Sequence, residues 1–305
     1  MILRSLVTAW VQNAAKERLR ETVQQAVREK LDPAAAGEAE PAAPRPCDVG
    51  IIFAEKSELG GMEDQLDGVL ATAGGGFTAR QGGLSGRNIV LLTSGAGSDA
   101  ARRGAEALIA GHHPRWIVSA GFADGLQSQL NRGDLLLVDR VTDETGRAFG
   151  IDLSVDPAAL AAAPGVHVGG LLSVEREPRT AAERTALAAA HPALAADRGS
   201  AAVAEVCSRE KVLFLAVRIV HRAAADEPPR EVERVANKKS MAGKLGAAVG
   251  ALVKRPSSVK DMWQVKEDEL LHSDRLAKFL SSVVAQLPKG RPDATEGQPA
   301  AGNST

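Results

Sequence analysis

The chain has no tyrosine, and aromatic residues make up only 3% of its 305 residues. Cys47 and Cys207 are the only cysteines, and neither belongs to a CxxC pair or lies near a pair of histidines. A disulfide framework and a cysteine-based zinc site are therefore excluded. We expect a protein of a reducing, cytoplasmic compartment that contains no metal.

An excess of charge of either sign is also missing, because 37 Lys and Arg oppose 38 Asp and Glu to give a net charge of −1. Nucleic-acid binding depends on a basic field, so we expect no nucleic-acid partner. No segment has the roughly 18 consecutive apolar residues that span a bilayer. The first residues have no small-residue cleavage site of the kind that follows a secretory signal.

Composition along the chain predicts four regions. Residues 1–32 have apolar residues at helical spacing and form an amphipathic helix, and a Pro- and Ala-rich linker follows at 33–46. The main domain covers 47–287, and the tail at 288–305 lacks apolar anchors and is expected to be disordered. A basic amphipathic helix can lie on an anionic membrane surface, but we expect this helix to dock on the domain or on a second subunit.

Within the main domain, strands alternate with helices. Apolar runs predict strands at 47–54, 88–95, 115–121, 134–141, 167–174 and 212–220. Helical spacing predicts helices from about Ser57, at 99–111 and at 200–210, and then at 231–253 and 257–287. This order indicates an α/β fold of three layers, with a twisted, mixed, mostly parallel sheet and helices on both faces.

Two glycine-containing loops follow predicted strands. "TSGAGSDAARRG" provides Ser94, Gly95 and Gly97, and "SAGFADGL" provides Gly121 and Phe122. Ligands of open α/β sheets bind at the carboxyl ends of the strands, where glycines let the backbone approach them closely. Neither loop matches GxGxxG or GxxxxGK[ST], so a dinucleotide or Walker-type site is not indicated. The two loops form either a shared pocket or simple strand-to-helix turns.

Five segments taken in order resemble the nucleoside phosphorylase and methylthioadenosine/S-adenosylhomocysteine nucleosidase superfamily. They read "DVGIIFAEKSEL", "LLTSGAGSDAARRGAEALIA", "IVSAGFADGLQSQLNRGDLLLVD", "ADRGSAAVAEVC" and "FLAVRIV". Residues 245–280 are similar to the hopanoid-associated phosphorylase branch of that superfamily. The resemblance implies a nucleoside phosphorylase-like fold and a homo-oligomer.

The resemblance also implies a site in which carboxylates cleave an N-glycosidic bond. Glu58 matches the glutamate that positions or activates the attacking water. Gly199, after Asp197 and Arg198, takes the place of the glutamate that binds the ribose hydroxyls. At these two positions the chain keeps one family carboxylate and lacks the other.

The group that protonates the leaving base is also changed. His221 and Arg222 stand where the family has a serine and the proton-donating aspartate. Arginine is a poor acid at neutral pH, so His221 is the plausible new acid, with Asp226 as a second candidate. The segment that carries the family's base-stacking aromatic has none here, so Phe122 is either the substitute ring or a residue that fills the core.

Two classes of function follow. The first is cleavage of the N-glycosidic bond of a small purine nucleoside, by a nucleosidase or by a phosphorylase with phosphate as co-substrate and no other cofactor. Its catalytic residues are Glu58 and His221. The second is an inactive nucleoside- or anion-binding scaffold, favoured by the lost carboxylates. Ligand binding in either class is assigned to a shared set of residues: Ser94, Gly95, Gly97, Gly121, Phe122, Asp197, Arg198 and Arg222.

The charge of the predicted pocket depends on four arginines near it. Arg176, Arg179, Arg198 and Arg222 give an electropositive pocket if two or more of them point inward. The other interpretation is that they are solvated or paired with neighbouring carboxylates.

Overall fold

The computed structural model describes residues 47–74, 76–151, 163–227 and 257–288 of the chain. These residues belong to Pro46–Thr305, one of the two units into which the chain divides. The helices predicted at 1–32 and 231–253, the linker at 33–46 and all but the first residue of the predicted tail lie outside the described residues.

The described residues form ten strands and five helices. The strands are β1 (Val49–Phe53), β2 (Asp67–Gly74), β3 (Phe77–Leu84), β4 (Arg87–Thr93), β5 (Trp116–Gly125), β6 (Leu135–Asp143), β7 (Ala148–Gly150), β8 (Val166–Ser173), β9 (Ala195–Asp197) and β10 (Leu213–Arg222). The helices are α2 (Lys56–Glu63), α3 (Ser98–His112), α5 (Ala181–Ala190), α6 (Ser200–Glu210) and α9 (Ser257–Gln286). Each strand and helix that we predicted within the described ranges is present.

All ten strands belong to one mixed sheet, in which five of the described pairings are parallel and five antiparallel. The prediction of a mixed sheet is confirmed, but the prediction that it is mostly parallel is wrong. β1 lies between β4 and β5 and is parallel to both, and β5 is also parallel to β10. Every residue of β1 is buried, as expected for a central parallel strand covered on both faces. β5, β10, β6, β8 and β9 pair in a closed ring, because β9 returns to β5.

The antiparallel strands β2 and β3 were not predicted. β2 pairs with β3, and β3 pairs with β4. Their sequences, DGVLATAG and FTARQGGL, are rich in glycine and alanine, which are depleted in strands. Gly82 is needed here, because a Cβ atom on it would lie 2.9 Å from the Cβ of Leu66 and 3.0 Å from the carbonyl oxygen of Asp67.

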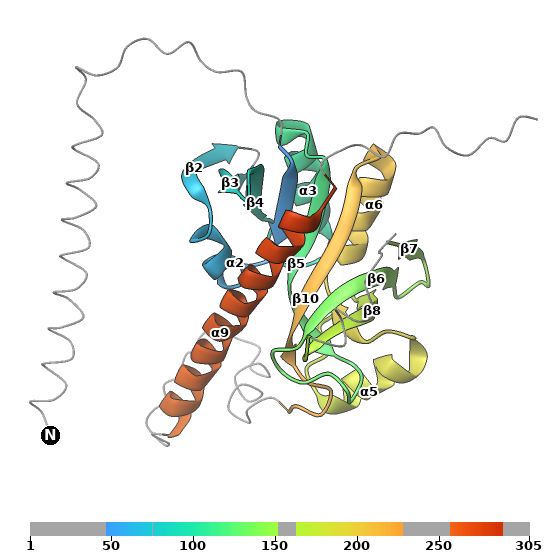
Figure 1. The fold of residues 1–305 in the computed structure, drawn as a ribbon. Coiled ribbons are helices and arrows are strands. Elements are labelled where there is room, and N and C mark those ends of the chain that lie inside the picture. The colour runs from blue at the N-terminus through green and yellow to red at the C-terminus, as the bar shows by residue number, and fades with distance from the viewer. Residues whose placement is uncertain (1–46, 75, 152–162, 228–256, 289–305) are drawn as a thin grey trace, which may run out of the picture. The chain divides into compact units, whose positions relative to one another are not determined.

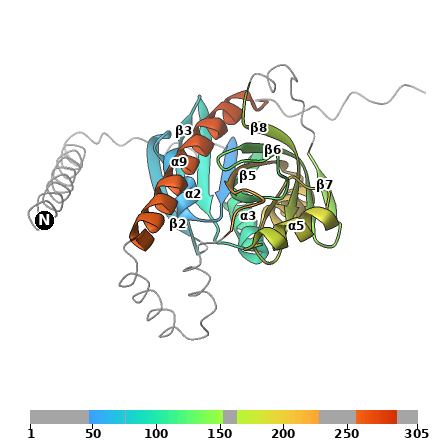
Figure 2. The ribbon, with the colours of Figure 1, turned by 90° about the horizontal axis from the view of Figure 1, so that it is seen from below.

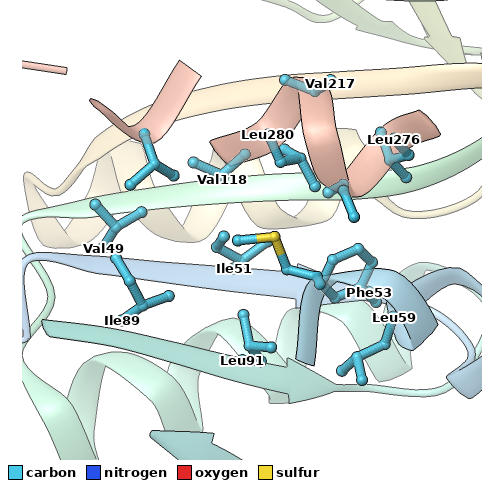
Figure 3. Close-up of a cluster of buried hydrophobic side chains, with 14 of the residues drawn as sticks. Val49, Ile51, Phe53, Leu59, Ile89, Leu91, Val118, Val217, Leu276 and Leu280 are labelled. Atoms are coloured by element: carbon cyan, nitrogen blue, oxygen red, sulfur yellow. The ribbon is translucent and has the colours of Figure 1, made fainter. Parts of the chain in front are cut away.

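Two layers of helices cover the two faces of the sheet. Neighbouring residues of β1 point to opposite faces, so Ile51 packs in one hydrophobic cluster and Ile52 in another. The first cluster includes Leu59 of α2 and Leu280 of α9 (Figure 3). The second includes residues of α3 and α6. The three-layer arrangement that the alternating pattern predicted is therefore present.

Helix α9 runs alongside α2 on the first face (Figures 1 and 2). Its buried residues Leu276, Leu280 and Val284 repeat every four positions, which gives it one apolar stripe facing the sheet. No helix within the described ranges is both long enough and apolar enough to cross a membrane.

This packing predicts the stability of two matched variants of α9. Leu280→Ala removes a side chain that is 0% exposed, and we expect it to lower the free energy of unfolding by about 2–5 kcal/mol. Leu271→Ala removes one that is 60% exposed, and we expect a change within about 0.5 kcal/mol. Urea unfolding of both proteins measures the difference. Equal effects would show that α9 does not pack on the sheet as described.

Candidate active site

A cavity of about 260 Å³ lies where the carboxyl ends of β1, β5 and β10 meet. These three strands are neighbours in the sheet (Figure 1). The loop after β4, the turn from β9 into α6 and one residue of α9 complete its wall. The structure brings all the residues of the predicted site into this wall: Glu58, Ser94, Gly95, Gly97, Gly121, Phe122, Asp197, Arg198, His221 and Arg222.

Glu58 projects from the first turn of α2 and is 7% exposed. Its Oε2 accepts hydrogen bonds from the backbone N–H groups of Ala54 (2.8 Å) and Glu55 (2.9 Å), and its Oε1 accepts one from Phe122 (2.8 Å). Burial raises the pKa of Glu58, and the backbone hydrogen bonds and the charge of Arg218 oppose that rise only in part. The carboxylate is therefore held in one orientation and has a raised affinity for a proton.

Gly121 explains how Glu58 fits against β5. Its φ is +151°, and a Cβ atom there would lie 2.6 Å from Oε1 of Glu58. A residue with a side chain would push the carboxylate away from β5 and break its hydrogen bond with Phe122. The glycine in "SAGFADGL" thus provides room for a carboxylate of the protein itself.

Arg218 is a site residue that the sequence interpretation missed. It is 4% exposed, and its Nη1 donates to the carbonyl oxygens of Ser119 (2.7 Å) and Val217 (2.8 Å). Its Nη2 donates to Asp197 Oδ2 (2.7 Å), Ser119 Oγ (2.7 Å) and Ser200 Oγ (2.6 Å). An arginine inside the apolar run "LAVRIV" was the available signal, because a buried cation requires a partner.

Asp197 is that partner, and its carboxylate is occupied within the protein. It also accepts hydrogen bonds from Ser173 Oγ (2.6 Å) and from the backbone N–H of Ser200 (3.0 Å). Burial would raise the pKa of Asp197, but the charge of Arg218 and these hydrogen bonds outweigh it and lower the pKa. Asp197 lines the cavity as part of an ion pair rather than as a free carboxylate.

A second ion pair involves Arg222. Its Nε donates to Asp124 Oδ1 (2.5 Å) and its Nη2 to Asp124 Oδ2 (2.9 Å). Nη2 also binds Glu177. Burial raises the pKa of Asp124, although Arg222 opposes the rise. Asp124 and Glu177 line the cavity, and both were absent from the predicted site.

The electropositive alternative is therefore wrong for Arg222, whose charge faces two carboxylates. Arg176 pairs with Glu183 and its side chain is 77% exposed. Arg198 donates to the carbonyl oxygen of Glu175 (3.2 Å). The arginines near the site are used mainly in bonds within the protein.

A β-bulge places His221 in the cavity wall. Arg218 of β10 pairs with Gly121 of β5, but the register shifts between Val220 and Arg222, so that Arg222 pairs with Asp124. The bulge gives β10 one extra residue, His221, and bulges change the direction of nearby side chains. Two consecutive residues, His221 and Arg222, therefore both line the cavity.

The ring of His221 stacks on Phe122 at 5.0 Å between centroids, and the edge of His272 from α9 meets both rings. The Nδ1 atoms of both histidines are buried with no hydrogen-bond partner among the described residues. Burial, followed by the charges of His272 and Arg222, lowers the pKa of His221. His221 is therefore mainly neutral near pH 7, and it is protonated at lower pH.

Asp226, the second candidate acid, does not reach the site. Its carboxylate binds Arg132 (2.5 Å) and the backbone N–H of Ala223 (2.7 Å), and it does not line the cavity. In the ranges that the structure covers, no group of three or more His, Cys, Asp and Glu side chains is arranged to hold a metal ion.

The loop at Ser94–Gly97 faces the cavity as the sequence predicted. Gly95 and Gly97 have φ values of +92° and +96°, which favour glycine. Gly97 precedes the first turn of α3, and the side chain of Arg198 lies beside it. The backbone N–H groups of Ser94 and Gly95 donate to the carbonyl oxygens of Phe53 (2.9 Å) and Ala54 (3.0 Å), which fixes the loop against the end of β1.

The chain is similar in sequence to known proteins of one superfamily. The sequence model of the Phosphorylase superfamily matches residues 48–254. A 5'-methylthioadenosine/S-adenosylhomocysteine nucleosidase of Colwellia psychrerythraea (strain 34H) is 29% identical over 211 residues, which cover 60% of this chain and 87% of that protein.

Two solved structures of such nucleosidases have the same fold. The enzyme of Neisseria meningitidis, in complex with methylthio-immucillin-A, has a TM-score of 0.59 at 19% identity and covers 79% of this chain and 99% of its own. The Colwellia psychrerythraea enzyme in complex with adenine has a TM-score of 0.53 at 23% identity, with 62% and 88% covered.

The Arg218–Asp197 pair predicts a pH-dependent stability. Asp197→Asn leaves a buried guanidinium without its counter-charge, and we expect a loss of about 3–5 kcal/mol at pH 7. The folded pKa of Asp197 lies below its unfolded value, so its contribution is complete above the unfolded pKa and is lost as the pH falls through the folded pKa. Urea unfolding at pH 7 and about pH 3 should therefore show a smaller difference between variant and wild type in acid.

Glu106→Gln is the control, because it removes an ion pair with Arg209 whose side chains are about half exposed. Such pairs contribute about 0–1 kcal/mol. An Asp197→Asn variant as stable as this control at pH 7 would contradict the role given to the pair.

Proposed function

The chain belongs to the Phosphorylase superfamily, and from that membership we propose that it cleaves the N-glycosidic bond of a purine nucleoside. One observation supports this most directly. A buried carboxylate, Glu58, is fixed by three backbone N–H groups at the wall of a cavity into which the strand ends open.

Glu58 has the geometry to hold a nucleophilic water. A carboxylate has about four lone-pair positions, and the three backbone bonds use two on Oε2 and one on Oε1. One position on Oε1 is left for a water molecule. The raised pKa of Glu58 suits a general base, since it favours taking a proton from that water as the oxygen attacks the sugar.

Hydrolysis is favoured over phosphorolysis by the charges in the cavity. A phosphate nucleophile next to Glu58 would meet a carboxylate, and Arg218, the cation whose charge acts on Glu58, already uses its donors within the protein. Arg198, which lines the cavity beside Gly97 and donates from Nε to a backbone carbonyl, is the cation that a phosphate would use in phosphorolysis. Water needs no such cation. The proposed reaction uses no metal and no cofactor.

On the leaving-group side, His221 is the proposed acid. It lines the cavity beside Arg222 and stacks on Phe122, so the two rings offer a flat wall to a purine base. The nucleosidases in the comparison have been solved with adenine or a nucleoside analogue bound, which supports a small nucleoside as the ligand here. Cytoplasmic location and homo-oligomer formation stay predictions from the sequence.

A binding protein without catalysis is the second candidate. The specific support is Gly199, which has no side chain where the resemblance implies a ribose-binding carboxylate. The neighbouring Asp197 does not replace it, because its carboxylate is paired with Arg218.

Replacement of Glu58 tests the proposal. We expect Glu58→Gln to lower base release by about 10²–10⁴-fold, the usual contribution of a general base. Release is measured with methylthioadenosine, S-adenosylhomocysteine, adenosine and inosine, each with and without phosphate. Glu106→Gln, a surface carboxylate outside the cavity, should leave the rate unchanged.

Each outcome has a definite meaning. Release that requires phosphate would replace hydrolysis by phosphorolysis. Release that is equal in wild type and Glu58→Gln would contradict the role of Glu58. If a folded wild-type protein binds these nucleosides but releases no base from any of them, the binding protein is correct.

The pH dependence tests His221. As an acid it acts in its protonated form, and its pKa is lowered, so kcat should rise as the pH falls below about 6.5, the ordinary value, until protonation of the general base Glu58 reverses the rise. We expect His221→Gln to remove this rise while leaving the unfolding temperature within a few degrees of the wild type. The same pH profile in both proteins would exclude His221 as the acid.

A further inference from the structure

His272 of α9 packs against the proposed acid. The cavity wall includes Glu269, and His272 follows it three residues later, on the next turn of the helix. The edge of the His272 ring meets the ring of His221 at 5.7 Å between centroids and that of Phe122 at 6.4 Å. His221 therefore contacts one ring from β5 and one from α9.

The fold holds His272 in this position. The next residue of α9, Ser273, is buried in the packing of the helix. On the other side, a Cβ atom on Gly133 would lie 3.5 Å from Nε2 of His272. The turn that contains Gly133 is bonded to β10, because its N–H donates to the carbonyl oxygen of Val220 (2.8 Å), the neighbour of His221. The two imidazole rings are therefore fixed relative to each other.

Neither ring has an acidic partner at Nδ1. Within the described ranges, the Nδ1 atoms of both histidines are buried without a hydrogen-bond partner. The two carboxylates on the preceding turn of α9 are paired with cations instead, Glu269 with Lys266 (2.5 Å) and Asp268 with Arg132 (3.8 Å). A positive charge on one ring therefore acts directly on the other, with no carboxylate bonded at Nδ1 to offset it.

The surroundings of His221 disfavour its protonated form. Burial is the largest cause that lowers its pKa, and the charge of His272 is the second. The charges of Arg222, its neighbour in β10, and of Arg132 lower the pKa further, and Glu269 opposes them. Three cations thus surround this ring when His272 is protonated.

The surroundings of His272 are less unfavourable. Burial lowers its pKa too, but the next cause is the charge of Asp268, which raises it. Asp268 lies four residues earlier on the same face of α9. The charges of Arg132 and Arg275 lower the pKa and are the smaller causes. Of the two histidines, His272 is therefore the one that takes up a proton first as the pH falls.

Building on the proposed function, we propose that His272 controls the protonation of the acid, His221. As the pH falls, the first proton from solvent goes to His272, and the positive ring keeps its neighbour neutral until the pH is lower still. Base release is thereby confined to a more acidic range than His221 alone would give. His272 acts through His221 and is not among the described residues that line the cavity, so it is a positioning residue.

Titration of the ring nitrogens by NMR tests the pair without requiring activity. The six histidines are labelled with nitrogen-15, and the signals of the pair are assigned from His221→Gln and His272→Phe. His272→Phe keeps an aromatic ring against Phe122 but removes the charge, so we expect His221 to titrate at a pH higher by about one unit or more. His272→Gln removes the same charge with a polar side chain and should shift the titration in the same direction.

His191→Gln is the matched control. His191 follows α5 and lies outside the cavity wall, so its replacement should leave the titration of His221 unchanged. Thermal unfolding confirms that each variant is folded. In the active enzyme, the rise of kcat with falling pH should begin at a higher pH in His272→Phe than in the wild type.

The outcomes distinguish this role of His272 from the proposed function. A titration of His221 that is unchanged, or moved to lower pH, in both His272 variants overturns the role and leaves base cleavage intact. A shift to higher pH with an unchanged kcat profile also overturns it, because His221 would then not be the acid. A shift to higher pH in a protein that releases no base from any nucleoside supports the control of His221 by His272 and overturns the proposed function.

Discussion

The guanidinium of Arg218 joins four elements of the fold at the floor of the cavity. It extends from β10 and binds Ser119 of β5, Asp197 of β9 and Ser200 of α6. A buried arginine is tolerated only when its charge and its N–H groups are satisfied, so these elements must meet at this one place. The turn from β9 into α6 is held in the cavity wall for the same reason.

The other residues of the cavity wall form two groups on either side of Arg218. On the side of Glu58, backbone N–H groups fix the carboxylate, and Gly121 makes room for it. On the other side, His221 and Arg222 line the cavity. One half of the cavity wall therefore presents a fixed carboxylate, and the other half presents an imidazole ring and an ion-paired guanidinium.

The sequence was sufficient for the local parts of this structure. Long apolar runs predicted β1, β5 and β10, and the loops after β4 and within β5 pointed to the cavity. The sequence did not predict β2 and β3, because glycine and alanine have low strand propensity, and it did not predict β9, which has only three residues. Asp124 was missed because its partner, Arg222, lies far along the chain, and only the pairing of β5 with β10 brings them together. His272 was missed because α9 is placed by tertiary packing.

The ion pair of Arg222 with Asp124 and Glu177 constrains how this protein can evolve. Loss of Arg222 alone would leave Asp124, 6% exposed, as an uncompensated acid, at a cost of about 3–5 kcal/mol out of a total stability of about 5–15 kcal/mol. A single substitution at either position is therefore strongly disfavoured, whereas a joint exchange is tolerated. The two positions should coevolve across lineages, because exchange of one alone leaves an unpaired charge in the cavity wall.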